Sequence, residues 1–172
     1  MLKIFQFLFY YFIFILLNKQ INMKKTVIFD LDGTLALIDK RRALAAKPNG
    51  KINWKVFFDP KNIQLDQPNI PVIEMAKIIK AQGHSVVIFS GRDSISKTET
   101  INWLNQFGVP FDVLKMRPEG SFTPDDKLKM GWLNQLFPNR NDILCIFDDR
   151  DKVVKMWREQ GLTCMQVAPG DF

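Results

Sequence analysis

Short apolar runs alternate with amphipathic stretches along most of the chain. The runs rich in Val, Ile, Leu and Phe have the length of strands and fall at residues 26–30, 85–90, 111–116, 142–149 and 164–168. The stretches with helical apolar spacing lie between them, at residues 70–83, 96–108, 123–137 and 150–161. Strands that are almost continuously apolar belong to sheets buried on both faces. The pattern therefore predicts an α/β fold with about five parallel strands and helices on both faces.

Two segments depart from this alternation. Residues 37–69 interrupt the first strand–helix crossover and are predicted to form an irregular cap insert. Residues 1–22 are an apolar extension, whose 4–17 stretch would span roughly 21 Å as a helix, short of the ~30 Å core of a bilayer. Met23 directly precedes the first strand. We therefore predict that the translated protein starts at Met23 and forms one domain over residues 23–172, with a signal-anchor at residues 4–17 as the alternative.

Composition and charge narrow the class of protein without defining its activity. The chain has 172 residues and a net charge of +6, which suits one globular domain and permits a polyanionic partner. Cys145 and Cys164 are too few for a disulfide scaffold or a zinc site, and both fall in predicted strands. We therefore expect reduced core thiols and a cytoplasmic location. His84, the only histidine, opens a strand and is expected to be structural.

Polar side chains cluster where three of the predicted strands end, and a lysine lies in the helix before the last of these strands. The residues are Asp30, Asp32, Ser90, Lys129, Asp148 and Asp149. Because sites in open parallel sheets form at the carboxyl ends of the strands, we expect these groups to meet.

The order Asp-x-Asp-Gly-Thr, Ser, Lys and Asp-Asp resembles the haloacid dehalogenase superfamily in all four motifs, over residues 24–172. The resemblance implies a three-layer, Rossmann-like fold with a small cap, and magnesium-dependent phosphotransfer. It assigns Asp30 as the nucleophile that forms an aspartyl-phosphate, and Asp32 as the general acid and base. The implied phosphate-binding groups are Thr34, Ser90, Gly91 and Lys129. The implied Mg²⁺ ligands are Asp30, Asp32 through its carbonyl, Asp148 and Asp149, with the direct ligand among the last two left open.

The tail "DDRDKVVKMWREQGLTCMQVAPGDF" and the segment "LKMRPEGSFTPDDKLK" are similar to the 3′-phosphatase domain of phage-type polynucleotide kinase/phosphatases, especially small standalone forms. This resemblance adds Arg41, Arg92 and Asp125 to the functional residues, as groups that bind the substrate or its phosphate. It implies removal of 3′-terminal phosphates from DNA or RNA ends. The sequence has no G-x-x-x-x-G-K-[ST] phosphate loop, so we expect a phosphatase without the 5′-kinase half and without a nucleotide cofactor. The alternative is a phosphatase of the same superfamily acting on nucleotides or another small phosphate monoester.

The cap insert carries an excess of positive charge. Residues 37–69 hold seven basic and three acidic residues, with Trp54, Phe57 and Phe58 among them. Basic side chains with interleaved aromatic residues are typical of surfaces that bind single-stranded nucleic acid. The aromatic residues have a second interpretation, in which they anchor the insert on the domain.

Overall fold

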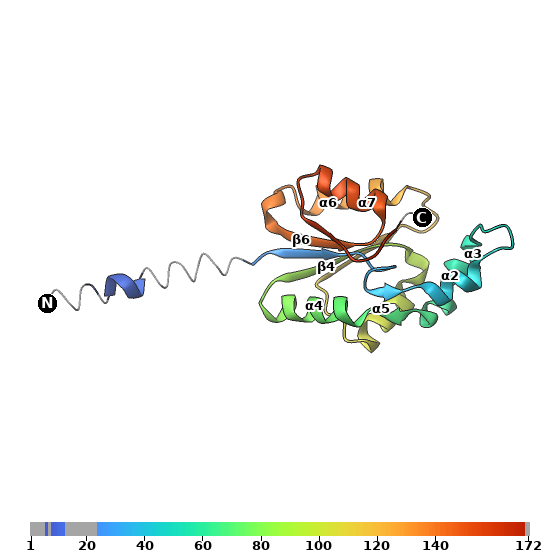
Figure 1. Ribbon diagram of the computed structural model, residues 1–172, viewed down its shortest axis with the longest axis horizontal. Coiled ribbons are helices and arrows are strands. Elements are labelled where there is room, and N and C mark those ends of the chain that lie inside the picture. Colours follow the sequence, from blue (N-terminus) through green and yellow to red (C-terminus); the bar gives the residue numbers. More distant parts are fainter. Residues whose placement is uncertain (1–5, 7, 13–23, 171–172) are drawn as a thin grey trace.

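A parallel sheet forms the middle layer of the protein. The computed structural model describes residues 6, 8–12 and 24–170, and its five-stranded sheet has the order β5-β4-β1-β6-β7 (Figure 1). The strands are β1 (Thr26–Phe29), β4 (Ser85–Asp93), β5 (Val113–Arg117), β6 (Ile143–Asp148) and β7 (Cys164–Gln166). Each neighbouring pair is parallel. The predicted α/β class and sheet are confirmed.

Helices cover both faces of this sheet. Figure 1 shows α4 (Ile70–Ala81) and α5 (Lys97–Gln106) on one side, and α6 (Asp125–Leu136) and α7 (Asp151–Glu159) on the other. Side chains alternate along β1, so Val27 and Phe29 join the core under α4 and α5, whereas Ile28 joins the core under α6 and α7. Both cores are apolar, which explains why consecutive residues of β1 are hydrophobic. Cys145 and Cys164 are buried in them as free thiols.

The insert is more regular than the sequence pattern predicts. It contains α2 (Asp39–Ala45), α3 (Trp54–Phe57) and the 3-10 helix η1 (Pro60–Leu65), and it projects from one end of the domain (Figure 1). Its two ends pair through the antiparallel strands β2 (Ala36–Leu37) and β3 (Gln67–Pro68). Ile38, Ala45 and Phe57 form a small apolar cluster of their own. The helices were missed because each is too short to show a full apolar period. Within the described residues, the chain also forms the 3-10 helices η2 (Ser94–Ser96) and η3 (Arg140–Asp142).

The expectations for residues 1–22, among them a start at Met23 and an anchor at 4–17, lie for the most part outside the described residues. In the described ranges, no helix is both long enough and apolar enough to cross a bilayer.

Strand pairing at the centre of the sheet determines where the polar strand ends lie. The Asp30 N–H donates to the Phe147 carbonyl oxygen at 2.8 Å, so the β1–β6 ladder continues one residue past β1. One residue earlier on each strand, the rings of Phe29 and Phe147 stack with their centroids 4.7 Å apart. Asp30 is therefore held beside Asp148, the last residue of β6. On the other side of β1, strand β4 runs further than predicted and carries the whole Ser90–Asp93 motif.

Candidate active site

Three carboxylates from two neighbouring strand ends converge at the carboxyl edge of the sheet. Asp30, Asp148 and Asp149 are buried, and each offers an oxygen within 4.8 Å of those of the other two. Burial raises the pKa of Asp30 well above its ordinary value, with the two other carboxylates adding to the effect and Lys129 opposing it. Burial and the charge of Asp148 raise the pKa of Asp149 to about 6. Carboxylates crowded in this way favour binding of a cation.

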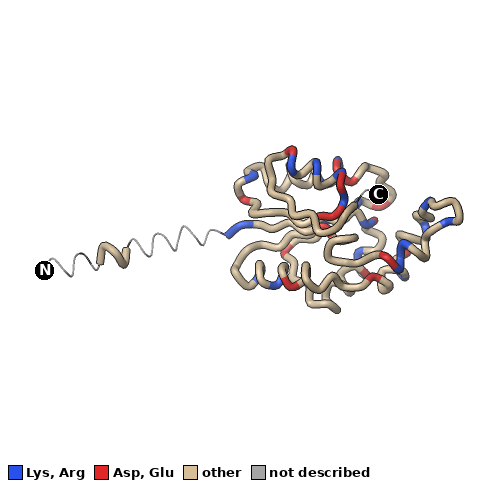
Figure 2. The backbone as a smooth tube through the Cα atoms, viewed as in Figure 1, with Lys and Arg blue, Asp and Glu red and all other residues tan. Residues whose placement is uncertain are grey.

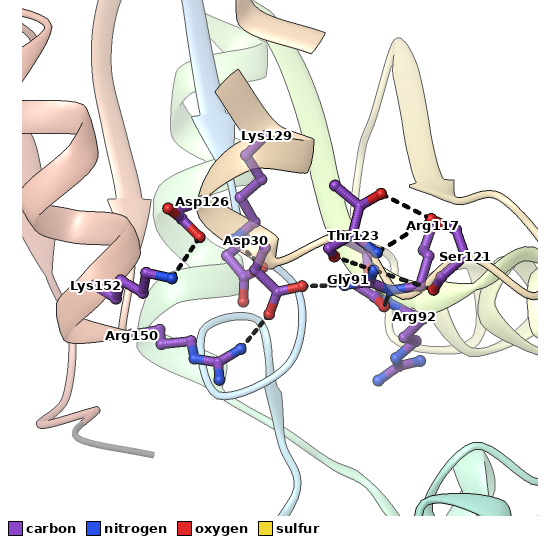
Figure 3. A network of polar contacts seen from close by, with 12 residues as sticks. Asp30, Gly91, Arg92, Arg117, Ser121, Thr123, Asp126, Lys129, Arg150 and Lys152 are labelled. Atoms are coloured by element: carbon purple, nitrogen blue, oxygen red, sulfur yellow. Dashed lines mark hydrogen bonds and ion pairs between the residues drawn. The ribbon is translucent and has the colours of Figure 1, made fainter. Parts of the chain in front are cut away.

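Lys129 places one positive charge in this cluster. Its Nζ donates to Asp30 Oδ1 at 2.6 Å and to Asp148 Oδ2 at 2.8 Å, and Figure 3 shows the side chain extending from α6 toward Asp30. Burial alone would lower the pKa of Lys129, but the charges of Asp148 and Asp30 raise it above its ordinary value. Lys129 is therefore charged in the folded protein. Three carboxylates and one ammonium leave an excess of negative charge, which a divalent cation would offset.

Asp32 faces away from this cluster toward two arginines. Arg41 Nη2 and Arg92 Nε donate to the same Asp32 oxygen, Oδ1, at 2.6 and 2.7 Å. Burial alone would raise the pKa of Asp32, but the charges of Arg92 and Arg41 lower it below its ordinary value. Asp30 and Asp32 thus lie two residues apart in sequence with pKa values displaced in opposite directions. This contrast is typical of carboxylates with different chemical roles.

The two arginines are joined by a further carboxylate, Asp66. Arg41 Nε donates to Asp66 Oδ1 at 2.8 Å and Arg92 Nη2 to Asp66 Oδ2 at 2.6 Å. The side chains of Arg41 and Arg92 are 1% exposed and that of Asp66 is 0% exposed. The Arg41 guanidinium also lies over the Phe57 ring, with Cζ 4.3 Å from the centroid. A closed network of two arginines and two aspartates therefore fixes the orientation of Asp32.

The turn after Asp32 packs directly against Asp149. Gly33 has φ +91°, and a Cβ at this position would lie 2.0 Å from Asp149 Oδ2. The next residue, Thr34, is fully buried and its Oγ1 donates to Asp149 Oδ1 at 3.3 Å. The Asp-Gly-Thr segment therefore forms one wall around the Asp149 carboxylate.

We expect Gly33→Ala to displace Asp149 and to lower turnover by about 10²-fold, since ångström-scale misplacement of a reacting group has effects of this size. Gly50→Ala is the matched control, because Gly50 also has a positive φ, +76°, but a Cβ there meets nothing within 4 Å. Both variants carry backbone strain of roughly 1–3 kcal/mol, measurable by denaturant unfolding. Equal activity of the two variants would show that the contact with Asp149 is unimportant.

Asp125, at the start of α6, joins two further arginines. Arg117 from the end of β5 and Arg150 from the loop after β6 both pair with its carboxylate. Arg117 Nε also donates to the Gly91 carbonyl oxygen at 2.9 Å, and a Cβ at Gly91 would lie 2.9 Å from Asp125 Oδ1 (Figure 3). This network links the ends of β4, β5 and β6 around the carboxylate cluster.

A cavity of about 630 Å³ lies over these groups. Its lining includes the predicted site residues Asp30, Asp32, Gly91, Asp125, Lys129, Asp148 and Asp149. It does not include Thr34, Arg41, Ser90 or Arg92. Ser90 is fully buried, and its Oγ accepts from the Arg92 N–H at 3.2 Å. The structure thus divides the predicted residues into a group that reaches the cavity and a group that lies behind it.

Comparison with protein families decides the identity of the domain. The family described as the polynucleotide kinase PNKP phosphatase domain matches residues 24–172. The chain belongs to this family. The match confirms the predicted resemblance and places this PNKP phosphatase domain among the phosphoric monoester hydrolases, as the motifs predicted.

Individual relatives of the PNKP phosphatase domain agree with this result. A protein of Autographa californica nuclear polyhedrosis virus, described as a bifunctional polynucleotide kinase/RNA ligase, is 30% identical over 141 residues, which are 78% of this chain and 18% of the viral protein. A chain of the Pnkp1/Rnl/Hen1 RNA repair complex is 32% identical with a TM-score of 0.74, over 87% of this chain and 44% of that one. The chain therefore spans less than half the length of either relative.

The wider superfamily shares the fold at lower identity. A haloacid dehalogenase-like hydrolase from Streptococcus pneumoniae is 15% identical with a TM-score of 0.58, over 83% of this chain and 84% of that one. This likeness supports the three-layer architecture, in which the sheet lies between two layers of helices.

Three polar residues of the PNKP phosphatase domain were not predicted from the sequence. Asp66 is one of the three acidic residues of the insert, and the sequence predicts no role for Asp66, Arg117 or Arg150. Each neighbours a predicted residue in the structure: Asp66 lies against Arg41 and Arg92, and the two arginines lie against Asp125. The only signal in the sequence is that Arg117 and Arg150 fall inside the two segments that carry the family resemblance.

Proposed function

We propose that the protein is a magnesium-dependent phosphatase that removes 3′-terminal phosphates from DNA or RNA ends. One observation carries the proposal: the cavity is lined both by the cluster of Asp30, Asp148, Asp149 and Lys129 and by residues of the basic insert, among them Arg42. The family and the RNA repair complex among its relatives support a nucleic-acid end as the substrate.

The donor set fits a magnesium ion. Carboxylate oxygens from Asp30, Asp148 and Asp149 lie together and are hard ligands of the kind that Mg²⁺ prefers. The family resemblance adds the Asp32 carbonyl as a fourth oxygen ligand. When bound, the ion would offset the charge of the substrate phosphate and allow a carboxylate to approach it. The excess negative charge of the cluster supports this assignment, since one divalent cation would bring it close to neutrality.

In the proposed reaction, Asp30 and Asp32 have the roles that the family resemblance implies. An Asp30 oxygen attacks the phosphorus and the bond to the 3′ oxygen of the substrate breaks. Because the arginines keep Asp32 ionised in the free site, Asp32 first takes up a proton, from solvent or from a singly protonated substrate phosphate, and then gives it to the leaving oxygen. Water then attacks the phosphorus of the aspartyl-phosphate, Asp32 takes the water proton, and Asp30 is restored as phosphate leaves. Lys129, with its charge in the cluster, stabilises the negative charge that develops on the phosphoryl oxygens.

Arg41 and Arg92 act through Asp32 in this proposal. The sequence resemblance assigned them to phosphate binding, but neither lines the cavity, and the guanidinium groups are directed at Asp32 and Asp66. Asp32 itself is 18% exposed and lines the cavity. The arginines therefore fix the orientation of Asp32 at the cavity, and Asp66 holds the arginines in place.

The insert supplies the surface that the nucleic-acid strand follows. Figure 2 shows basic residues along the projecting α2–α3 segment, and Lys47, Lys51 and Lys55 are exposed there. Arg42 and Trp54, from the same segment, line the cavity. A strand whose 3′ end enters the cavity would therefore pass its phosphates along these lysines.

Replacing Lys47, Lys51 and Lys55 together by alanine is expected to weaken the apparent affinity for a 3′-phosphorylated oligonucleotide. It should leave hydrolysis of a small chromogenic ester nearly unchanged. Each lost phosphate contact lowers the log–log salt slope by roughly 0.7 to 0.9, so the slope should fall by about two to three. Steady-state kinetics on both substrates over a range of salt concentrations measures this.

The matched control removes the same charge from another part of the surface. Lys24, Lys77 and Lys155 do not line the cavity, and their triple alanine variant should retain the parental salt slope. If the insert variant affects both substrates alike, or if oligonucleotide hydrolysis ignores salt, the insert is not a nucleic-acid surface. The small-molecule alternative would then be favoured.

A further inference from the structure

Phe122, in the loop between β5 and α6, is a large apolar side chain with no apolar cover. It is 97% exposed, more than any other large hydrophobic side chain in the described residues, and it lines the cavity that holds Asp30. Exposing a phenylalanine to this extent loses the free energy that its burial would contribute. A ring that is uncovered next to a substrate cavity is well placed to be covered by the substrate.

The loop that carries Phe122 is tied down on both sides of the ring. Arg117 Nη1 donates to the carbonyl oxygen of Ser121 at 3.3 Å and to that of Thr123. Gly120 N–H donates to Asp93 Oδ2 at 3.1 Å. Figure 3 shows Arg117 lying between this loop and Gly91. The backbone on either side of Phe122 is therefore fixed to the same arginine that contacts the strand end next to the site.

A second exposed aromatic ring lines the same cavity from the insert. Trp54 is 59% exposed, and Phe58 stacks beside it with centroids 5.6 Å apart and planes at 20°. Phe57, in contrast, is buried in the small core of the insert. Phe57 and Phe58 also line the cavity, but Phe57 is 7% exposed and anchors the insert, whereas Trp54 is largely uncovered.

We propose that Phe122 stacks on the base of the 3′-terminal nucleotide of the substrate, with Trp54 as a second aromatic ring in the lining of the same cavity. The inference rests on the proposed function and adds a residue that determines substrate preference. A flat, uncharged ring cannot bind a phosphate or a sugar hydroxyl, whereas every base offers a π face to it. The contact would favour a nucleotide that carries a base without selecting its identity, as an end-processing enzyme requires.

The test uses the full chain, its Phe122→Ala variant and three substrates. These are a 3′-phosphorylated oligonucleotide, the same oligonucleotide with an abasic 3′-terminal nucleotide, and a small chromogenic ester. The variant should raise KM for the first substrate about tenfold, which is ~1.4 kcal/mol and within the range for base–aromatic stacking. KM for the abasic oligonucleotide and the small ester, and kcat for all three, should stay within about twofold.

Substitutions that keep or lose the ring separate stacking from loop integrity. Phe122→Trp should restore the parental KM, Phe122→Leu should resemble the alanine variant, and Ile95→Ala, which removes another exposed apolar side chain, should change nothing. Equal losses on the normal and the abasic oligonucleotide, or no loss on either, would overturn the inference alone. If the unmodified protein releases no phosphate from the oligonucleotides, the proposed function fails and the inference fails with it.

Discussion

Asp30→Asn is expected to lower phosphatase turnover by at least ~10³-fold on every substrate, because the nucleophile acts as part of a unit whose members fail together. The change keeps the size of the side chain but removes the charge that attacks phosphorus. It also removes one of the three clustered carboxylates, which should weaken magnesium binding. The measurement is kcat for a small chromogenic ester and for a 3′-phosphorylated oligonucleotide, with circular dichroism to show that the variant is folded.

Two controls make this result specific. Asp39→Asn changes an exposed aspartate of the insert and should retain parental activity. Excess chelator should abolish the activity of the unmodified protein, and added Mg²⁺ should restore it. Appreciable turnover by Asp30→Asn, or full activity in chelator, would contradict the mechanism.

The second large effect is expected at a residue that does not line the cavity. Asp66→Asn leaves a neutral amide between two buried guanidinium groups, and breaking a buried ion pair in this way costs roughly 3–5 kcal/mol of stability. It should also let Arg41 and Arg92 shift and misplace Asp32, lowering kcat by about 10²-fold. Both effects are measurable, by denaturant unfolding and by steady-state kinetics.

Whether the variants change kcat or KM shows how the arginines act. If Arg41 and Arg92 position Asp32, then Arg41→Ala, Arg92→Ala and Asp66→Asn should all lower kcat on the small ester with little change in KM. Direct binding of substrate phosphate by the arginines would instead raise KM in the two arginine variants and leave Asp66→Asn close to the parental value. Thr100→Ala is a milder control, since it removes only a 3.4 Å bond to Arg92 Nη1.

The sheet and its strand-end chemistry could be predicted from the sequence because both depend on local pattern. The apolar run before Asp30 identifies a strand buried on both faces, and parallel strands bring their carboxyl ends to one edge. Asp148 and Asp149 end such a strand, and Lys129 lies in the helix that leads to it. For that reason these groups lie together in the structure, and Lys129 is within hydrogen-bonding distance of Asp30 and Asp148.

The partners behind the site could not be predicted, since they depend on contacts between distant segments. Asp66 lies in the polar stretch "IQLDQPN", where nothing marks it as buried. Asp66 is buried only when the insert folds back onto the domain. The Asp66 backbone carbonyl oxygen then accepts a hydrogen bond from Trp103 Nε1 at 3.1 Å. Phe122 is the opposite case: a phenylalanine is expected to be buried, and its exposure appears only with the loop in place.

End-group analysis tests the central claim most directly. The full chain, with Mg²⁺, is incubated with an oligonucleotide phosphorylated at both ends and separately with a 3′-mononucleotide. Mass spectrometry then identifies which phosphate has been lost. The account predicts a 3′-hydroxyl with the 5′-phosphate intact, and a kcat/KM for the oligonucleotide at least about tenfold above that for the mononucleotide, given the added stacking and phosphate contacts. Loss of the 5′-phosphate, or equal efficiency on the mononucleotide, would contradict it.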